Sequence, residues 1–460
     1  MDNVETASLL GLLDELEVGL QDLVPCGPAV ASLVERTCTL LRTPDRAAIN
    51  TVCRLTTDLL RLADDKLNSY PYKDVPVHWR RLYTDAALLG ALARLLIPAM
   101  DAHERRASLR EAVRKLDLAI VIAGAPGDGR EDMALRLIAL AQKQLSSLHP
   151  EGQHEQAFIV RGGEGRVVPV EVGGDYTKEG WGQRMMEFHE LLDALEFVDV
   201  QPREPGARAP PPEAILGDST LEYGNGISSS GQTSSSPILY LAQHSLFRQF
   251  PSLLSDILIP DLVYSAPDTD GTGAPYEPPA TEDGYILNAW LGPAGTKSAA
   301  HTDPWWNCYV QVAGSKWLWV APPSCSSAMS AFGSEPAATA PSSICITSSE
   351  PEAPASEEHD QRGSAQAEQY MSNTSSLDVT IPPPGPALAT PPASDEASPP
   401  LLSTGRERGD DGYYPRAWLE QVEPHARQAV LREGDVLVMP PRWWHAMVSL
   451  ETSFSVSIWF

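Results

Sequence analysis

Residues 288–316 read NAWLGPAGTKSAAHTDPWWNCYVQVAGSK, and this stretch alternates short apolar runs with turn signals. Turns such as Gly292-Pro293 separate runs that are too short to form helices. The same pattern recurs on either side, in YILNAWL, CYVQVA, KWLWVAP, VLVMP and the closing SFSVSIWF, where apolar residues alternate with serine. Many short strands with frequent turns predict a jelly roll or barrel.

The N-terminal third of the chain has a different periodicity. From residue 1 to about 148, apolar residues recur every three or four positions, as in Leu9, Leu12, Leu13 and Leu16, and this spacing predicts helices. We therefore expect an α+β protein. An all-helical support or docking domain would cover residues 1–148, and a β domain would cover residues 167–460.

Three stretches have compositions unlike those of packed domains. Polar, Gly-rich residues 149–166 predict a linker. Residues 201–236 and 324–415 are rich in Pro, Ser, Gly or Ala, and we expect them to be low-complexity insertions, mostly disordered, because they cannot bury much of a core. Residues 176–195 are expected to be a helix, with Trp181 and Phe188 on one side.

The overall charge narrows the classes of function. The chain of 460 residues has 34 Lys+Arg and 61 Asp+Glu, a formal net charge of −27. This excess of acidic residues argues against direct binding to nucleic acid, which requires a basic surface. It suits a basic, Arg- or Lys-rich protein partner, or simply solubility.

Targeting and redox signals are weak. The six cysteines form no CxxC pair and no zinc spacing. We see no signal peptide, and no run approaches the ~20 apolar residues that cross a bilayer. A nuclear or cytoplasmic location without a membrane partner is therefore expected.

The pair His301 and Asp303 lies at the centre of the opening stretch, and His445 follows in PPRWWHAMV, near a second predicted strand. Two imidazoles and one carboxylate form the facial set that binds Fe(II) and leaves positions open. An HxD pair alone is a weak motif, because most such pairs are ordinary surface or core residues. The two strand blocks must meet if these three residues share a metal.

The chain resembles the Jumonji-C (JmjC) family of Fe(II)- and 2-oxoglutarate-dependent oxygenases. The resemblance lies in VPVEVGGDYTKEGW, YLAQHSLF, LNAWLGPAGTKSAAHTDPWWN, the spaced GSK, PPRWWHA and SFSVSIW. It covers residues 167–323 and 413–460, and residues 371–379 (MSNTSSLDV) look like a family segment between the insertions. It implies a cupin-type double-stranded β-helix and makes His301, Asp303 and His445 the catalytic iron ligands, with 2-oxoglutarate and O2 as co-substrates.

The resemblance also implies a set of 2-oxoglutarate-binding residues. Lys316 would meet the distal carboxylate of the co-substrate, with Tyr240 and Ser298 sharing this role, while Asn307 and Trp459 would line the same site. Charge-assisted bonds of this kind are about twice as strong as neutral ones. The alternatives are a lysine that extends its charge to solvent at a sheet edge and a tryptophan that only packs in the core.

A second implied set surrounds the substrate side chain: Glu171, Trp181, Gln243 and Trp290. A carboxylate, an amide and tryptophan faces suit a guanidinium, so we favour hydroxylation of an arginine in a protein substrate. Demethylation of a histone N-methyl-lysine by the same iron chemistry and a non-catalytic cupin-like binding protein remain alternatives. Trp305 and Trp306 depart from the family pattern by adding bulk beside the metal.

Overall fold

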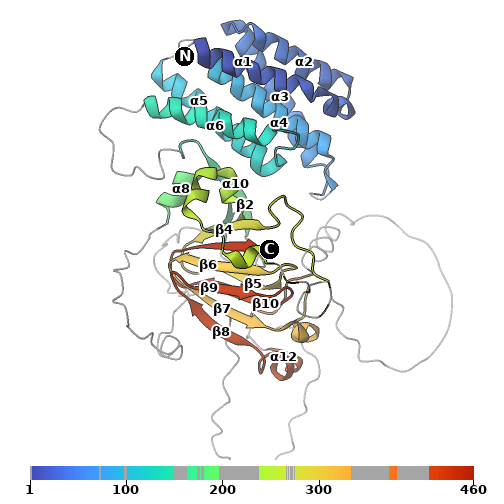
Figure 1. Cartoon of the computed structure of the whole chain (residues 1–460), viewed down its shortest axis with the longest axis vertical. Helices are drawn as coiled ribbons and strands as arrows, with labels where there is room; N and C mark the ends of the chain where they lie inside the picture. Colours follow the sequence, from blue (N-terminus) through green and yellow to red (C-terminus); the bar gives the residue numbers. More distant parts are fainter. Residues whose placement is uncertain are drawn as a thin grey trace, which may run out of the picture. The chain divides into compact units, whose positions relative to one another are not determined.

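The computed structural model places most of the chain in two compact units (Figure 1). It describes residues 3–71, 74–97, 101–148, 163–173, 177, 181–195, 238–265, 267, 269, 273, 275–332, 372–380 and 414–460. The first unit comprises Met1–Val170, Gln183–Leu195 and Leu246–Ser255, and the second comprises Glu171–Gly182, Glu196–Ser245 and Asp256–Phe460. The expected order, helices first and antiparallel sheets second, is confirmed.

The first unit is built on helices. They are α1 (Asn3–Val18), η1 (Leu20–Cys26), α2 (Pro28–Arg42), α3 (Arg46–Leu67), α4 (Val77–Leu96), α5 (Ala102–Leu118), the π-helix η3 (Ala119–Ala123) and α6 (Arg130–Ser147). Asp45 and Asp101 begin α3 and α5, because each side chain accepts a hydrogen bond from a backbone N–H of the first turn. Helix α4 is buried along most of its length, so it forms the centre of this unit.

Buried ion pairs join the helices of the first unit. The Asp85 carboxylate on α4 accepts hydrogen bonds from Arg81 at 2.9 Å and from Arg130 at 2.8 Å. Arg130 also donates to the backbone oxygen of Leu16, near the end of α1. Arg166, which the sequence places at the end of the linker, is buried and pairs with Asp117 at 2.8 Å. Ordered structure thus begins before residue 167.

The predicted helix over residues 176–195 is wrong at residues 182–187. Strand β2 (Gly182–Glu187) precedes the short helix α8 (Phe188–Asp193). The alternation of side chains in this stretch fits a sheet edge beside β1 (Val167–Val172) as well as it fits a helix. Pairing with a neighbouring strand therefore outweighed the local helical spacing.

Helices α10 (Leu246–Gln249), η4 (Pro251–Asp256) and η5 (Asp261–Tyr264) follow later in the chain.

Two antiparallel sheets form the barrel. The remaining strands are β3 (Leu239–His244), β4 (Ile286–Gly292), β5 (Lys297–Thr302), β6 (Asn307–Ala313), β7 (Lys316–Ala321), β8 (Arg427–Leu431), β9 (Val436–Met439), β10 (Trp444–Ser449) and β11 (Ser453–Trp459). One sheet has the order β2-β1-β3-β4-β11-β6-β9, and the other has the order β5-β10-β7-β8. The last strand, β11, pairs with both β4 and β6. Strands distant in sequence are therefore neighbours, as a jelly roll requires.

Part of the stretch expected to be a low-complexity insertion is ordered. Residues 324–415 include most of η6 (Pro323–Ala328), and residues 372–380 place Leu377 and Val379 in a buried cluster with Trp319 and Trp444. Helix α12 (Arg416–Gln421) follows directly. Composition averaged over a long window hides these few apolar residues. The insertion expected at 201–236, residues 333–371 and residues 381–413 lie outside the described residues.

Candidate metal centre

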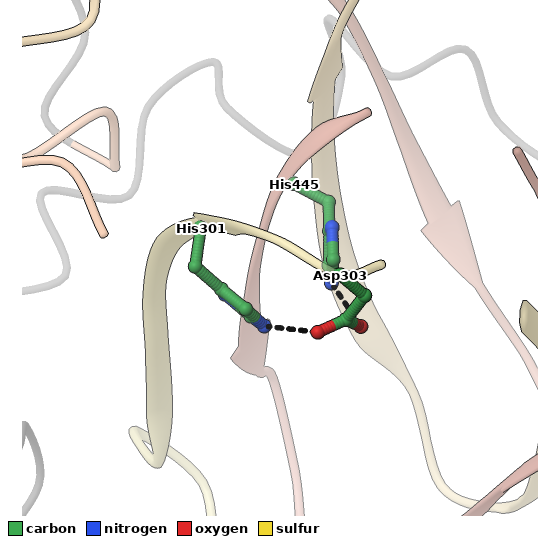
Figure 2. Close-up of side chains that lie close together, drawn as sticks. All are labelled: His301, Asp303 and His445. Carbon is green, nitrogen blue, oxygen red and sulfur yellow. Dashed lines mark ion pairs between the residues drawn. The ribbon is translucent and has the colours of Figure 1, made fainter. Parts of the chain in front are cut away.

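Strands β5 and β10 bring the three predicted ligands together. These strands pair antiparallel, with His445 directly opposite His301, and Asp303 follows β5. The Nε2 atom of His301 lies 3.9 Å from one Asp303 carboxylate oxygen, and the Nε2 atom of His445 lies 3.5 Å from the other. Figure 2 shows the three side chains pointing toward one another. Their potential ligand atoms all lie within 4.8 Å of one another.

The other ring nitrogen of each histidine is occupied by the backbone. His301 Nδ1 lies 2.8 Å from the Ala299 oxygen, and His445 Nδ1 lies 3.1 Å from the Trp443 oxygen. A carbonyl oxygen only accepts, so each Nδ1 carries the proton and each Nε2 presents a lone pair to the centre. Burial, and next the nearby His301, lower the pKa of His445 to about 4. Its imidazole is thus neutral, the form that binds a metal.

The backbone around Asp303 is also constrained. Its carbonyl oxygen accepts a 2.7 Å hydrogen bond from the backbone N–H of Arg442. Arg442 has a φ of 64°, a left-handed conformation that is unfavourable for a residue with a side chain. Such conformations persist where surrounding contacts impose them, and here the contact joins the two chain segments that carry the ligands.

This donor set fits a divalent first-row metal. Two imidazoles and one carboxylate converge from one side, and the arrangement matches the facial set of non-haem Fe(II) sites. The cluster opens onto a cavity lined by Trp290, Ser298, His301, Asp303, Asn307, Tyr309, His445 and Met447. The structure thus brings six of the predicted site residues into one pocket.

Lys316 lies next to this cavity and is 1% exposed. Its Nζ donates to the hydroxyl of Tyr309 at 3.1 Å and to that of Tyr240 at 3.4 Å. Within the part of the chain that the structure describes, no carboxylate pairs with it. Burial lowers the pKa of Lys316 to about 7. A buried amine with only hydroxyl partners can bind an incoming carboxylate.

Tyr309 and Met447 line the cavity but were not predicted as site residues. Tyr309 lies two residues after Asn307 on β6, and Met447 lies two residues after His445 on β10. Alternate residues of a strand share a face, so their spacing from predicted site residues could have revealed both. Burial raises the pKa of the Tyr309 hydroxyl well above its usual range, which keeps it a neutral hydrogen-bonding group.

Several buried polar atoms at this end of the barrel have no protein partner. Among the described residues, Asn307 Oδ1, Asn288 Nδ2 and Trp459 Nε1 make no hydrogen bond. Buried polar groups are normally paired, so Asn307, which lines the cavity, has a free group for a ligand. Trp459 does not line the cavity; its ring lies 5.4 Å from that of Trp305.

The predicted substrate residues occupy three adjacent strands and a neighbouring loop. Glu171 on β1 is the register partner of Tyr240 on β3, and its carboxylate accepts a hydrogen bond from the Trp181 indole at 3.1 Å. Trp290 on β4 lines the cavity, whereas Glu171, Trp181 and Gln243 do not.

Gln243 has an unusual backbone. Its φ is 45°, and the pairing of β3 with β4 shifts register between Leu241 and His244. Bulges of this kind redirect a side chain and occur beside functional sites. The substrate roles of all four residues remain predictions.

Among the described helices, we find none that is both long and apolar enough to cross a bilayer.

A family model described as a cupin-like domain matches residues 176–460. Jumonji C domain-containing protein 5 of Drosophila melanogaster is 26% identical over 304 residues, which cover 66% of this chain and 49% of that protein. Lysine-specific demethylase 8 of Xenopus tropicalis is 26% identical over 303 residues, covering 66% of this chain and 43% of that protein.

Lysine-specific demethylase JMJ30 of Arabidopsis thaliana is 25% identical over 295 residues, covering 64% of this chain and 43% of that protein. The matched region therefore spans less than half the length of each of these three relatives. The resemblance to a solved structure, the X-ray structure of E. coli ycfD, has a TM-score of 0.20 at 11% identity, over 64% of this chain and 41% of that one, and carries no argument. With its two antiparallel sheets and its family match, this chain belongs to the cupin-like domain family and resembles JmjC proteins of the Jumonji C domain-containing protein 5 type.

Proposed function

We propose that this chain is an Fe(II)- and 2-oxoglutarate-dependent hydroxylase that acts on an arginine side chain of a protein substrate. The observation that carries the proposal is the convergence of His301, Asp303 and His445 on a cavity that adjoins the buried amine of Lys316. A metal ligand set and an unpaired buried cation in one place suit a co-substrate that chelates with one end and carries a carboxylate at the other.

Each residue would have a distinct task. His301, Asp303 and His445 would hold Fe(II), which when bound supplies oxidative chemistry that consumes 2-oxoglutarate and O2, releases succinate and CO2, and converts a substrate C–H bond into C–OH. Lys316, Tyr240 and Tyr309 would bind the distal carboxylate. Ser298 and Asn307 would orient the same molecule from the cavity wall, and the apolar surface of Trp290 would exclude water.

The arginine assignment is supported by Glu171 and the aromatic residues around it. The Trp181 indole fixes the Glu171 carboxylate in one orientation, and Trp290 lies at the cavity wall. A carboxylate can bind a guanidinium through two parallel bonds, and an indole face can stack on its plane. The net charge of −27 suits a basic substrate segment. The helical unit would then serve to dock a partner.

Lysine demethylation is the second candidate, favoured by the names of the similar proteins from Xenopus tropicalis and Arabidopsis thaliana. The same oxidant would hydroxylate an N-methyl group, which would leave as formaldehyde. A purely binding cupin-like protein is the third candidate, and it predicts no turnover.

Mass spectrometry of peptides after turnover distinguishes these candidates. The full chain is incubated with Fe(II), 2-oxoglutarate and peptides that contain arginine or methyl-lysine, and succinate is measured in parallel. Gain of one oxygen on arginine supports the proposal. Loss of a methyl group from lysine instead identifies a demethylase. If the wild type releases no succinate and His301→Ala gives the same result, the chain is a binding protein.

Glu171→Gln tests the arginine pocket. We expect kcat/KM for the arginine peptide to fall roughly tenfold or more, because hydrogen bonds to charged groups contribute about 1.5–3 kcal/mol. The control is Glu433→Gln, because Glu433 is exposed and lies in the turn before β9. This substitution removes the same charge and should leave kcat/KM unchanged. Equal effects of the two variants would remove the case for Glu171.

A further inference from the structure

Residues 372–380, here called the 372–380 segment, lie along β5, the strand that carries His301. Strand β5 pairs with β10 on one edge. On its other edge His301 forms an isolated bridge with Thr374, and the Ser375 N–H donates to the Ala300 oxygen at 2.7 Å. The ligand strand is therefore enclosed on both edges, although β5 is the last strand of its sheet.

The 372–380 segment is anchored independently of the ligands. The Ser376 N–H donates to the Ser330 oxygen at 3.0 Å, and Leu377 is buried in the core beside the sheet. Lys297, the first residue of β5, forms an ion pair with Asp378 at 2.5 Å, with both side chains mostly buried. The Tyr414 hydroxyl donates to the Asp378 backbone oxygen at 2.6 Å. These contacts hold the segment firmly against β5.

Asn373 contacts the peptide that lies between the two ligands of the HxD pair. The Thr302 N–H donates to the Asn373 backbone oxygen at 3.0 Å, and the Asn373 side-chain amide donates to the Thr302 oxygen at 2.9 Å. One residue thus binds both the donor and the acceptor of Thr302. Thr302 lies between His301 and Asp303 in the sequence, so a rotation of the Thr302 backbone would move both ligands.

We propose that Asn373 is a positioning residue of the metal centre. Its side-chain amide orients the Thr302 carbonyl and thereby holds His301 and Asp303 in the geometry in which they meet His445. The Arg442 N–H holds the next carbonyl, that of Asp303, at 2.7 Å. Consecutive carbonyls at the end of β5 are therefore fixed from two different chain segments. Metal sites need ligand positions held within about half an ångström, and this pair of contacts provides that restraint.

This inference rests on the proposed metal site, and its test separates the two. Co(II) affinity of the full chain is measured by visible absorption and chelator competition, without co-substrate or turnover. Asn373→Ala removes the amide donor and keeps the backbone contact. We expect Co(II) affinity to fall about tenfold, at the lower end of the roughly 10- to 100-fold loss seen when an outer partner of a metal ligand is removed.

Asn68→Ala is the matched control. The Asn68 amide also donates to a backbone oxygen, that of Asp64, at 3.0 Å, and lies in the helical unit. Its loss should leave Co(II) affinity unchanged. Asn373→Asp, which cannot donate, should weaken Co(II) binding at least as much as Asn373→Ala.

The outcomes are distinct. Weaker Co(II) binding by both Asn373 variants, with an altered Co(II) spectrum and a metal-free melting temperature like that of Asn68→Ala, supports the positioning role. Wild-type affinity in both Asn373 variants overturns it and leaves the metal site intact. If the metal-free melting temperature falls while Co(II) affinity at low temperature is unchanged, the amide is merely structural and the proposal fails. If the wild type binds no Co(II), or if His301→Ala binds Co(II) as tightly as the wild type does, the metal site itself is refuted.

Discussion

Lys316 combines deep burial with the absence of an acidic partner among the described residues. Burial lowers its pKa from 10.5 to about 7, because the charged amine loses its hydration. A bound carboxylate would favour the charged form and raise the pKa again. Binding of 2-oxoglutarate above pH 7 should therefore take up a proton.

The pH dependence of binding follows from this proton uptake. Below the pKa of about 7 the amine is already charged and affinity for 2-oxoglutarate should be level. Above it, affinity should fall by up to about tenfold per pH unit. Calorimetry between pH 7 and 9, with Mn(II) to prevent turnover, measures both the affinity and the proton uptake. Lys316→Met should bind weakly and without this slope; a flat profile in the wild type would contradict the assignment.

Tyr309 gives a second prediction at the scale of single residues. Its hydroxyl accepts a hydrogen bond from Lys316, and its side chain lines the cavity, so Tyr309→Phe should weaken 2-oxoglutarate binding by about 1 kcal/mol, the usual net contribution of one hydrogen bond. Tyr83→Phe, which removes a buried hydroxyl from α4 of the helical unit, is the control and should not change the affinity. The same calorimetric titration compares the two variants.

At the scale of elements, the turn between β6 and β7 sets the spacing of the cavity residues. It joins the strand of Asn307 and Tyr309 to the strand of Lys316, and Gly314 within it has a φ of 69°. A Cβ atom there would lie 2.2 Å from the Thr452 backbone oxygen. Only glycine allows the turn to lie so close to the turn before β11.

Gly314→Ala should therefore destabilise the protein for two reasons, unfavourable φ and steric overlap. Gly434→Ala isolates the first, because Gly434 has a φ of 86° and a Cβ would meet nothing within 4 Å. We expect Gly434→Ala to cost roughly 1–2 kcal/mol, the penalty of a left-handed alanine, and Gly314→Ala to cost more. Urea unfolding of both variants measures the difference, and similar losses would show that the turn relaxes to accommodate the methyl group.

At the scale of the whole molecule, metal binding should be coupled to stability. Two of the ligands come from β5 and the loop that follows it, and the third comes from β10, which is distant in sequence. The unfolded chain therefore has no preformed site. A metal at about 100 times its Kd should add about 2.7 kcal/mol to the free energy of unfolding. Thermal unfolding with and without Mn(II) tests this.

The controls for metal-linked stability are histidine variants. His445→Ala should remove the stabilisation by Mn(II), whereas exposed His103→Ala in the helical unit should retain it. A stabilisation that persists in His445→Ala would place the metal elsewhere.

Local pattern was sufficient for much of this molecule. Helical spacing over the first 148 residues and short alternating runs after residue 285 predicted the element types, because burial of one face requires a regular period. The HxD pair and His445 were identified from residue type and local strand context. In contrast, residues 182–187 form a strand where helical spacing was read, since neighbouring strands supply the hydrogen bonds.

Side-chain chemistry and strand periods are properties of short stretches, so the ligand types and the β-rich domain could be predicted before any fold was known, whereas the burial of Lys316 could not. The partners of those side chains could not be predicted either. Tyr309 beside Lys316, His445 opposite His301 and Asn373 on Thr302 are contacts between strands or segments whose register depends on packing of the whole barrel. Sequence spacing does not encode that register, because it is selected by the burial of residues far apart in the chain.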